Sequence, residues 1–232
     1  MIQNRQNWFN VRCDLPFRSI INQLNSTPYN ESTNIGFDVL EINPKRLFSR
    51  YIERQIIIEE LRHPFGALEK INSTKYVIFQ FEVIHINNDF FLIKILNPPQ
   101  SLKNFVNTLS GLFHGDFFIS RIGIDVEDCF NTLLQSDCIT RFSVEKLIAS
   151  CISFGEKTMA SINLKSSDNA YNEFKKRYKK TQYKLDKLMM TLRFNDEWES
   201  IEISSSGLII CTAGLDKLVE KYIAKKELTT IK

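Results

Sequence analysis

Residues 75–86 read KYVIFQFEVIHI, and after Asn87-Asn88-Asp89 the chain continues as FFLIKIL over residues 90–96. Large apolar residues alternate with residues of mixed character in the first run, as they do in a strand with one buried face. Asn and Asp tolerate the positive φ angles of tight turns. The stretch therefore predicts an antiparallel β-hairpin, and the rest of the chain can be interpreted outward from it.

The flanks of this hairpin predict a helix on each side. Pro98 and Pro99 end the second strand, and Ser101 can cap a helix over SLKNFVNTLSGLF, residues 101–113. Residues 45–62 place Leu47, Tyr51 and Ile56 at helical spacing, so a helix is expected there as well. Further upstream, short strands are expected at residues 8–15 and 37–42, with a helix from Phe17 to Leu24 and a loop over 26–33 between them.

A similar order of elements begins again after residue 115. A strand is expected at 117–126 and helical stretches at 128–135, 142–151 and 168–188. Strands are expected at 157–164, 187–194, 198–203 and 208–212, followed by a last helix at 215–228. The third helical stretch is basic and amphipathic.

Three landmarks occur in the same order in both halves, and the members of each pair lie close to half of the 232 residues apart: Asp14 and Asp125, Asn88 and Ser206, Ser101 and Leu215. This regular offset predicts an internal repeat, with a first unit at 1–114 and a second at 115–232. The alternative is that a hairpin followed by a helix is simply common in α+β folds. The fold class expected is α+β, with two pseudo-repeats of strand, helix, antiparallel strands and helix.

The composition restricts the classes of protein to consider. Hydrophobic residues make up 43% and charged residues 25%, as in a globular fold, and the formal net charge is only +3. Binding to nucleic acid would therefore need a local basic patch. Five scattered cysteines without C-x-x-C spacing, and the lack of a signal-peptide pattern or a long apolar run, favour an intracellular protein (nucleus, cytoplasm or viral factory) that is not secreted and does not enter a membrane.

Residues 205–214, SSGLIICTAG, resemble the TATA-binding protein family, in which a hairpin built around Ser-Ser-Gly leads through a Thr-Gly-Ala-type step into a long helix. Asn43-Pro44-Lys45-Arg46 is similar to the Asn-Pro-Lys-Arg turn of that family. The resemblance implies a curved, saddle-like antiparallel sheet with helices on one face. It also implies a divergent member, such as those encoded by large DNA viruses.

The family binds the DNA minor groove, so the resemblance implies a transcription initiation factor whose partners are AT-rich double-stranded DNA and other transcription proteins. Asn10 stands where the family has a groove-reading Asn. The residues expected at the DNA are then Asn10 and Arg12 on the first opening strand, Arg121 on the second, and Lys45 and Arg46 in the turn.

The strongest basic feature is FKKRYKKTQYKLDK, residues 174–187. Lysine and arginine interleaved with tyrosine suit contact with phosphates combined with stacking on bases. A solvated helix face would look the same in sequence, and both interpretations remain open. The candidate DNA contacts in this segment are Lys175, Lys176, Arg177, Lys179 and Lys180.

Two other functions are compatible with the sequence. The family inserts phenylalanine wedges between base steps, but Ser204 and Ile86 occupy the corresponding positions here. A protein-interaction subunit with the same fold that has lost DNA bending is therefore an alternative, as is an RNA-binding accessory subunit. No enzyme activity, cofactor or small-molecule substrate is expected, because the three histidines are isolated and no phosphate-binding or nucleophile motif occurs.

Overall fold

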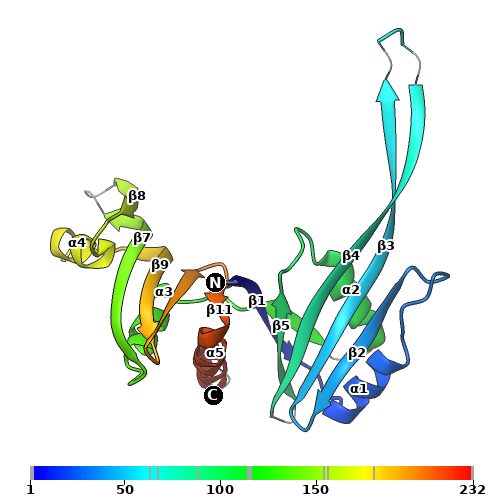
Figure 1. Ribbon diagram of the computed structural model, residues 1–232, viewed down its shortest axis with the longest axis horizontal. Coiled ribbons are helices and arrows are strands. Elements are labelled where there is room, and N and C mark those ends of the chain that lie inside the picture. Colours follow the sequence, from blue (N-terminus) through cyan, green and yellow to red (C-terminus); the bar gives the residue numbers. More distant parts are fainter. Residues whose placement is uncertain are drawn as a thin grey trace. The chain divides into compact units, whose positions relative to one another are not determined.

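The computed structural model describes residues 3–62, 64–66, 68–87, 89–113, 117–153, 155, 157–179 and 181–230 (Figure 1). The chain divides into two compact units. The first unit is Phe9–Ser120, and the second unit combines Met1–Trp8 with Arg121–Lys232. Strand β1, Gln3–Arg12, contributes its first residues to the second unit and its last residues to the first unit.

The first unit contains a sheet in the order β2-β3-β4-β5-β1, in which neighbouring strands from β2 to β5 pair antiparallel. Its other elements are α1 (Phe17–Asn25), β2 (Ile35–Asn43), β3 (Arg46–Arg62), β4 (Leu68–Asn87), β5 (Phe90–Leu96), α2 (Lys103–Leu112) and β6 (Phe118–Arg121). One face of the sheet packs against both helices: Leu24 of α1 and Phe105 of α2 belong to the same buried cluster as Phe81 and Tyr51.

The predicted hairpin is confirmed. Phe81 lies opposite Ile95 and Val83 lies opposite Ile93, and all four side chains are buried on the helix-covered face. The turn residue Asn88 lies outside the described residues. The expected helix 17–24, loop 26–33, strand 37–42 and helix 101–113 also correspond to α1, the α1–β2 connection, β2 and α2.

The helix expected over 45–62 is wrong, because these residues form the 17-residue strand β3. Its helix-covered face alternates apolar and polar residues: Leu47, Ser49, Tyr51 and Glu53 are all buried. Ser49 Oγ donates a hydrogen bond to the Asp38 carbonyl (3.0 Å), and Glu53 accepts hydrogen bonds from Tyr51 (3.1 Å) and Asn104 (2.6 Å). Two polar residues at buried positions therefore concealed the period of two that marks a strand.

The second unit contains an antiparallel sheet in the order β1-β11-β10-β9-β7-β8. Its elements after Arg121 are α3 (Val126–Leu134), β7 (Ile139–Ser153), β8 (Met159–Lys165), α4 (Ala170–Arg177), β9 (Lys184–Phe194), β10 (Glu197–Ser204), β11 (Leu208–Thr212), a 3-10 turn (Ala213–Leu215) and α5 (Asp216–Thr230). Helix α3 packs against β9 and α5, so one face of this sheet is helix-covered.

Two further expectations in this unit need correction. The helix expected at 142–151 is part of strand β7, whose buried residues Val144, Leu147 and Ala149 are spaced three and then two apart. The pairing with β9 shifts register between Val144 and Lys146, and the extra residue of such a bulge imitates helical spacing. The helical stretch expected at 168–188 contains only the two-turn helix α4, and strand β9 begins at Lys184.

The α+β class is confirmed, since both units combine helices with antiparallel strand pairs. The strand expected at 117–126 is shorter than predicted, ending at Arg121, and Asp125 caps α3 by accepting a hydrogen bond from Asp128 N (3.0 Å). Among the described residues, no helix has both the length and the apolar character to cross a membrane.

Candidate nucleic-acid interface

The face of the second sheet that is opposite the buried side chains forms a half-exposed surface, called here the second open face. Residues that lie opposite one another across antiparallel strands point to the same side, so the register identifies its members. One row across six strands runs through the following residues: Arg5, Ile210, Glu202, Met189, Lys146 and Lys165. A neighbouring row contains Ser204, Lys187, Ile148 and Asn163.

The charges on this face are mainly positive, and two carboxylates at it have partners: Glu202 pairs with a lysine, and Glu145 accepts a hydrogen bond from Thr191 Oγ1. Glu202 Oε1 lies 2.6 Å from Lys187 Nζ, on the adjacent strand. Lys146 and Lys165 lie opposite each other on β7 and β8. Arg5 lies at the opposite end of the same row. Cations therefore stand at both ends, and the apolar and hydroxyl side chains between them form a strip.

The strip contains short polar groups as well. Ser200, Thr191 and Ser143 lie opposite one another on β10, β9 and β7. Gln3 Nε2 donates a hydrogen bond to Ser200 Oγ (2.7 Å), and Asn7 Oδ1 accepts one from Arg121 Nη2 (2.6 Å). The hydroxyls of Thr191 and Ser143 already donate to Glu145 Oε1 and to the Asp168 carbonyl, so among these three the Ser200 hydroxyl is the donor that can match the acceptor-only edge of an A·T minor groove.

The corresponding helix-free face of the first unit, the first open face, has a different charge balance. Its arginines come from β3, and two of them are ion-paired: Arg46 with Glu82 (3.1 Å) and Arg50 with Asp38. Lys94, only 2% exposed, also contacts Glu82 (2.9 Å). The acidic partners neutralise much of the positive potential, so this face is less suited to phosphates than the second.

The predicted residues of the first unit lie in two separate places. Asn10 and Arg12 lie on β1, where Asn10 Oδ1 accepts a hydrogen bond from Ser120 Oγ on β6. Lys45 is exposed in the β2–β3 turn, and Arg46 begins β3. Because β5 and β4 lie between β1 and β3, the two pairs do not form one cluster.

Arg121 and the basic residues around α4 belong to the second unit. Lys175 Nζ contacts Glu127 Oε1 of α3 (2.9 Å) and Tyr183 Oη (2.6 Å), so this lysine joins α4 to α3 and to the residue that precedes β9. Lys176 forms an ion pair with Glu173 in its own helix (3.0 Å). Lys179 is exposed, and Lys180 lies outside the described residues.

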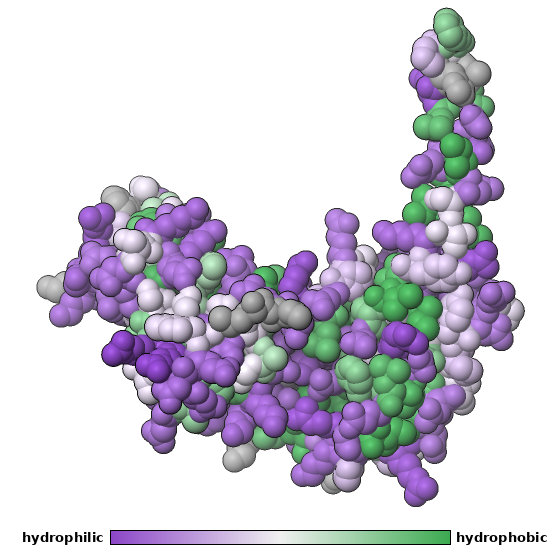
Figure 2. Space-filling model, viewed as in Figure 1, coloured by the Kyte–Doolittle hydropathy of each residue, from purple (hydrophilic) through white to green (hydrophobic). Residues whose placement is uncertain are grey.

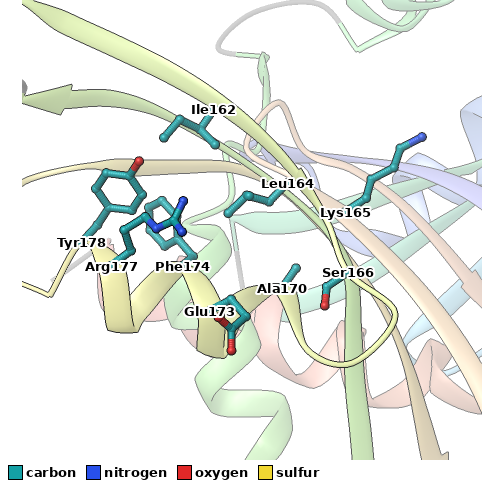
Figure 3. A pocket seen from close by; sticks show the side chains of 9 residues that line it. All are labelled: Ile162, Leu164, Lys165, Ser166, Ala170, Glu173, Phe174, Arg177 and Tyr178. Atoms are coloured by element: carbon teal, nitrogen blue, oxygen red, sulfur yellow. The ribbon is translucent and has the colours of Figure 1, made fainter.

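A cleft of about 270 Å³ lies between β8 and α4 (Figure 3). Ile162 and Leu164 point from the strand toward Phe174 and Arg177 of the helix, whereas Lys165 points away from it. Arg177 is therefore part of the wall of this cleft. Its apolar floor packs α4 onto the edge of the sheet.

The sequence did not indicate Lys146 or Arg5 as members of a site, and Lys187 entered only as the last residue of the basic segment 174–187. Lys146 was assigned to a helix, so its position opposite Met189 could not be deduced. Arg5 precedes the strand that was expected to start at residue 8. A period-two interpretation that allowed for one bulge in β7 would have placed Lys146 on the face opposite Val144.

The described residues contain no group of three or more His, Cys, Asp or Glu side chains arranged to hold a metal ion. Burial raises the pKa of the Cys129 thiol, and Tyr222 is similarly buried, with a raised pKa, where it donates a hydrogen bond to Asp128 (3.0 Å). These groups support packing between α3 and α5. A scan of the sequence against protein-family models gives no match, and a search of curated proteins gives none either.

Proposed function

We propose that the chain is a transcription initiation factor similar to TATA-binding protein, which binds the minor groove of AT-rich double-stranded DNA with its open faces. The observation that carries the proposal is the row across six strands of the second open face. In this row, Arg5 at one end and Lys146 and Lys165 at the other flank Ile210 and Met189.

This arrangement suits a minor groove for two reasons. Apolar and hydroxyl side chains can lie against sugars and base edges without requiring a donor for each acceptor. Cations at both ends of the strip can contact the phosphates of the two strands that border the groove, and these contacts provide most of the affinity. The neutral pair of Lys187 and Glu202 would then position the duplex rather than attract it.

The order of elements supports the finer form of the proposal, in which the units are pseudo-repeats of one curved sheet. The first unit runs from β1 through α1 and four strands to α2. The second runs from β6 through α3 and β7, β9, β10 and β11 to α5, with β8 and α4 inserted after β7. The four strands β2-β3-β4-β5 and their counterparts β7-β9-β10-β11 follow the same lateral order, whereas β6 pairs only with β1.

The test is a fluorescence-anisotropy titration of the full chain with an AT-rich duplex at two salt concentrations. Reversing Lys146 and Lys165 to Glu is expected to weaken binding and to lower the slope of log affinity against log salt by about two. Lys217→Glu with Lys221→Glu on α5, exposed residues of the helix-covered side, is the matched control and should change little. Absence of binding at low salt would disprove a factor that binds DNA on its own.

A protein-interaction subunit is the second candidate, because Glu82 and Glu202 neutralise cations on the open faces and Ser204 stands where a wedge is expected. This candidate predicts that the Lys146 and Lys165 reversals leave promoter activity unchanged. Competition with duplex RNA in the same titration distinguishes the RNA-binding alternative, which requires a preference for RNA.

A further inference from the structure

Strand β8 forms one edge of the second sheet, and helix α4 follows it in the chain and lies beside it (Figure 1). β8 pairs with β7 on one side, and the part of the chain that the structure describes places no strand on its other side. The strand reads MASINLK and contains no proline. The register shift of this pair falls between Ala149 and Ile152 of β7, so β8 itself is regular. A regular open edge can accept another extended segment as a further strand.

The hydrogen bonds identify the residues that offer their main chain at this edge. Ser166, directly after β8, donates its N–H to the carbonyl oxygen of Glu145 (3.0 Å), so the main chain of Ser166 points toward β7. Main-chain direction alternates along a strand. Lys165, Asn163 and Ser161 therefore present their N–H and C=O groups at the open edge of β8.

The side chains between these positions line the cleft of about 270 Å³ (Figure 3). Ile162 and Leu164 are half-buried and point into the cleft, and Ala170 and Phe174 of α4 line it from the other side. An added strand places every second side chain on this side of the sheet, next to Ile162 and Leu164. The cleft and the open edge of β8 together are called here the edge groove, and its apolar walls favour apolar residues at alternate positions of the added strand.

The charges around the edge groove are mainly positive. Arg177 is exposed and lines the cleft, whereas Lys165 is exposed on the other side of β8. Glu173 is the acidic residue among those that line the cleft, and it pairs with Lys176 (3.0 Å). Figure 2 shows mainly hydrophilic residues around α4 and β8, with a few hydrophobic ones exposed among them. A segment added at this edge therefore meets a cation on each side.

We propose that the edge groove binds an extended acidic segment of a partner protein, which adds to β8 as a further strand. Every second residue of this segment is apolar and enters the cleft. The residues between them carry carboxylates, which lie on the same side of the sheet as Lys165 and pair with it. Arg177 attracts a further carboxylate at the rim of the cleft.

Two other kinds of occupant fit the edge groove less well. The cleft is smaller than the about 300–1,000 Å³ of a typical small-molecule pocket, but it can take the side chains of a peptide. A helix lying in the cleft satisfies its own main chain, so the N–H and C=O groups of Lys165, Asn163 and Ser161 stay unused. An extended segment uses both the apolar walls and the main chain of β8.

Fluorescence anisotropy with a labelled synthetic peptide tests the chemistry of the partner. The probe has blocked ends and the seven-residue length of β8, and glutamate alternates with valine along it. The full chain is expected to bind it at least about tenfold more tightly than peptides in which lysine replaces glutamate or serine replaces valine. No binding of the probe overturns the proposal. Equal binding of the serine peptide also overturns it, because charge alone then explains the affinity.

Charge reversal on the protein tests the two cations. Arg177→Glu and Lys165→Glu should each weaken binding of the probe about tenfold, because repulsion replaces attraction. Lys217→Glu makes the same change at an exposed position of α5 and should bind like the native chain. The double variant of Arg177 and Lys165 should prefer the lysine peptide, which also shows that it is folded. A double variant that fails to reverse the preference overturns the assignment.

N-methylation of the peptide tests whether it adds as a strand. Its N–H groups point alternately toward β8 and toward solvent, so methylating the glutamate nitrogens and methylating the valine nitrogens should have unequal effects. One of the two methylated peptides is expected to lose binding and the other to keep most of it. Equal effects overturn strand addition. None of these measurements contains DNA, so their outcome is separate from that of the duplex titration.

Discussion

Lys175 of α4 and Glu127 of α3 form an ion pair, with Nζ 2.9 Å from Oε1. Burial opposes the charge of Glu127, but hydrogen bonds from Lys175, Tyr171 and Tyr183 outweigh it, and the pKa of this carboxyl is lowered. The pKa of Lys175 is raised, first by its hydrogen bond with Tyr183 and then by Glu127. One lysine of the basic segment therefore holds the inserted helix on the second unit.

Replacing Lys175 by Met is expected to destabilise the second unit by about 1–2 kcal/mol, because the partly buried Glu127 loses its charged donor. Thermal denaturation followed by circular dichroism measures the change. Lys179→Met, which alters an exposed residue of the same segment, is the control and should leave the melting temperature unchanged. Equal effects of both variants would contradict the structural role of Lys175.

The same ion pair predicts a dependence of stability on pH. The folded state holds the pKa of Glu127 below its ordinary value of 4.5, so the unfolded chain takes up the proton first as the pH falls. The stabilisation that Glu127 contributes is therefore complete above its ordinary pKa, and it is lost as the pH falls through the lower pKa of the folded state. Denaturant titrations at neutral pH and near pH 3 should show that the free energy of unfolding falls less in Glu127→Gln than in the native chain.

The Ser-Ser-Gly turn makes a separate prediction about Gly207. Its φ angle is +83°, and a Cβ atom there would lie 2.0 Å from the carbonyl oxygen of Ile122. Gly207→Ala is therefore expected to cost about 2–4 kcal/mol of unfolding free energy. Gly155→Ala, where a Cβ meets no atom within 4 Å, is the control measured by the same denaturant titration. If Gly207→Ala leaves the free energy of unfolding unchanged, the turn is not restrained by Ile122.

The five cysteines should divide by reactivity. Cys138 and Cys151 are exposed, whereas Cys13, Cys129 and Cys211 are buried. Burial also raises the pKa of Cys13 and Cys129, which lowers the thiolate fraction. Titration with a chromogenic disulfide at neutral pH is expected to modify Cys138 and Cys151 rapidly and the other three only after denaturant is added. Fast reaction of a buried thiol would indicate local opening.

The basic residues in and directly after α4 should contribute through charge alone. Reversing Lys176 and Lys179 to Glu is expected to lower the salt slope of duplex binding by about two and to leave any preference for AT-rich sequence unchanged, as phosphate contacts do. Anisotropy titrations with AT-rich and GC-rich duplexes measure both quantities. An unchanged slope would show that this segment is a solvated helix face.

The sequence predicted most elements whose buried residues are uniformly apolar. The β4–β5 hairpin was found because Phe79, Phe81 and Val83 keep the period of two that marks a strand. Helices α1, α2 and α5 were found because their apolar residues keep helical spacing. Strand β3 was missed because Ser49 and Glu53 are buried through hydrogen bonds, which no hydrophobic pattern reveals. Strand β7 was missed because its bulges shift the spacing.

The candidate site was harder to predict than the fold. Its rows form across strands that are distant in the sequence, such as Arg5 opposite Ile210 and Met189 opposite Lys146. A sequence shows which residues are charged, but pairing register decides which charges share a face. The basic segment at 174–187 was conspicuous in sequence because its charges are local, and the structure divides it between α4, a turn and β9.

Strand β1 also has a consequence for how the chain folds during synthesis. Gln3–Asn7 leave the ribosome long before their partners on β11, which extend from Thr212 to Leu208. The first unit is complete once residue 120 has emerged, whereas the second must wait until its opening strand can close a loop across nearly the whole chain. A fragment that starts at Arg121 would lack the strand that covers the edge of β11 and would be prone to aggregate.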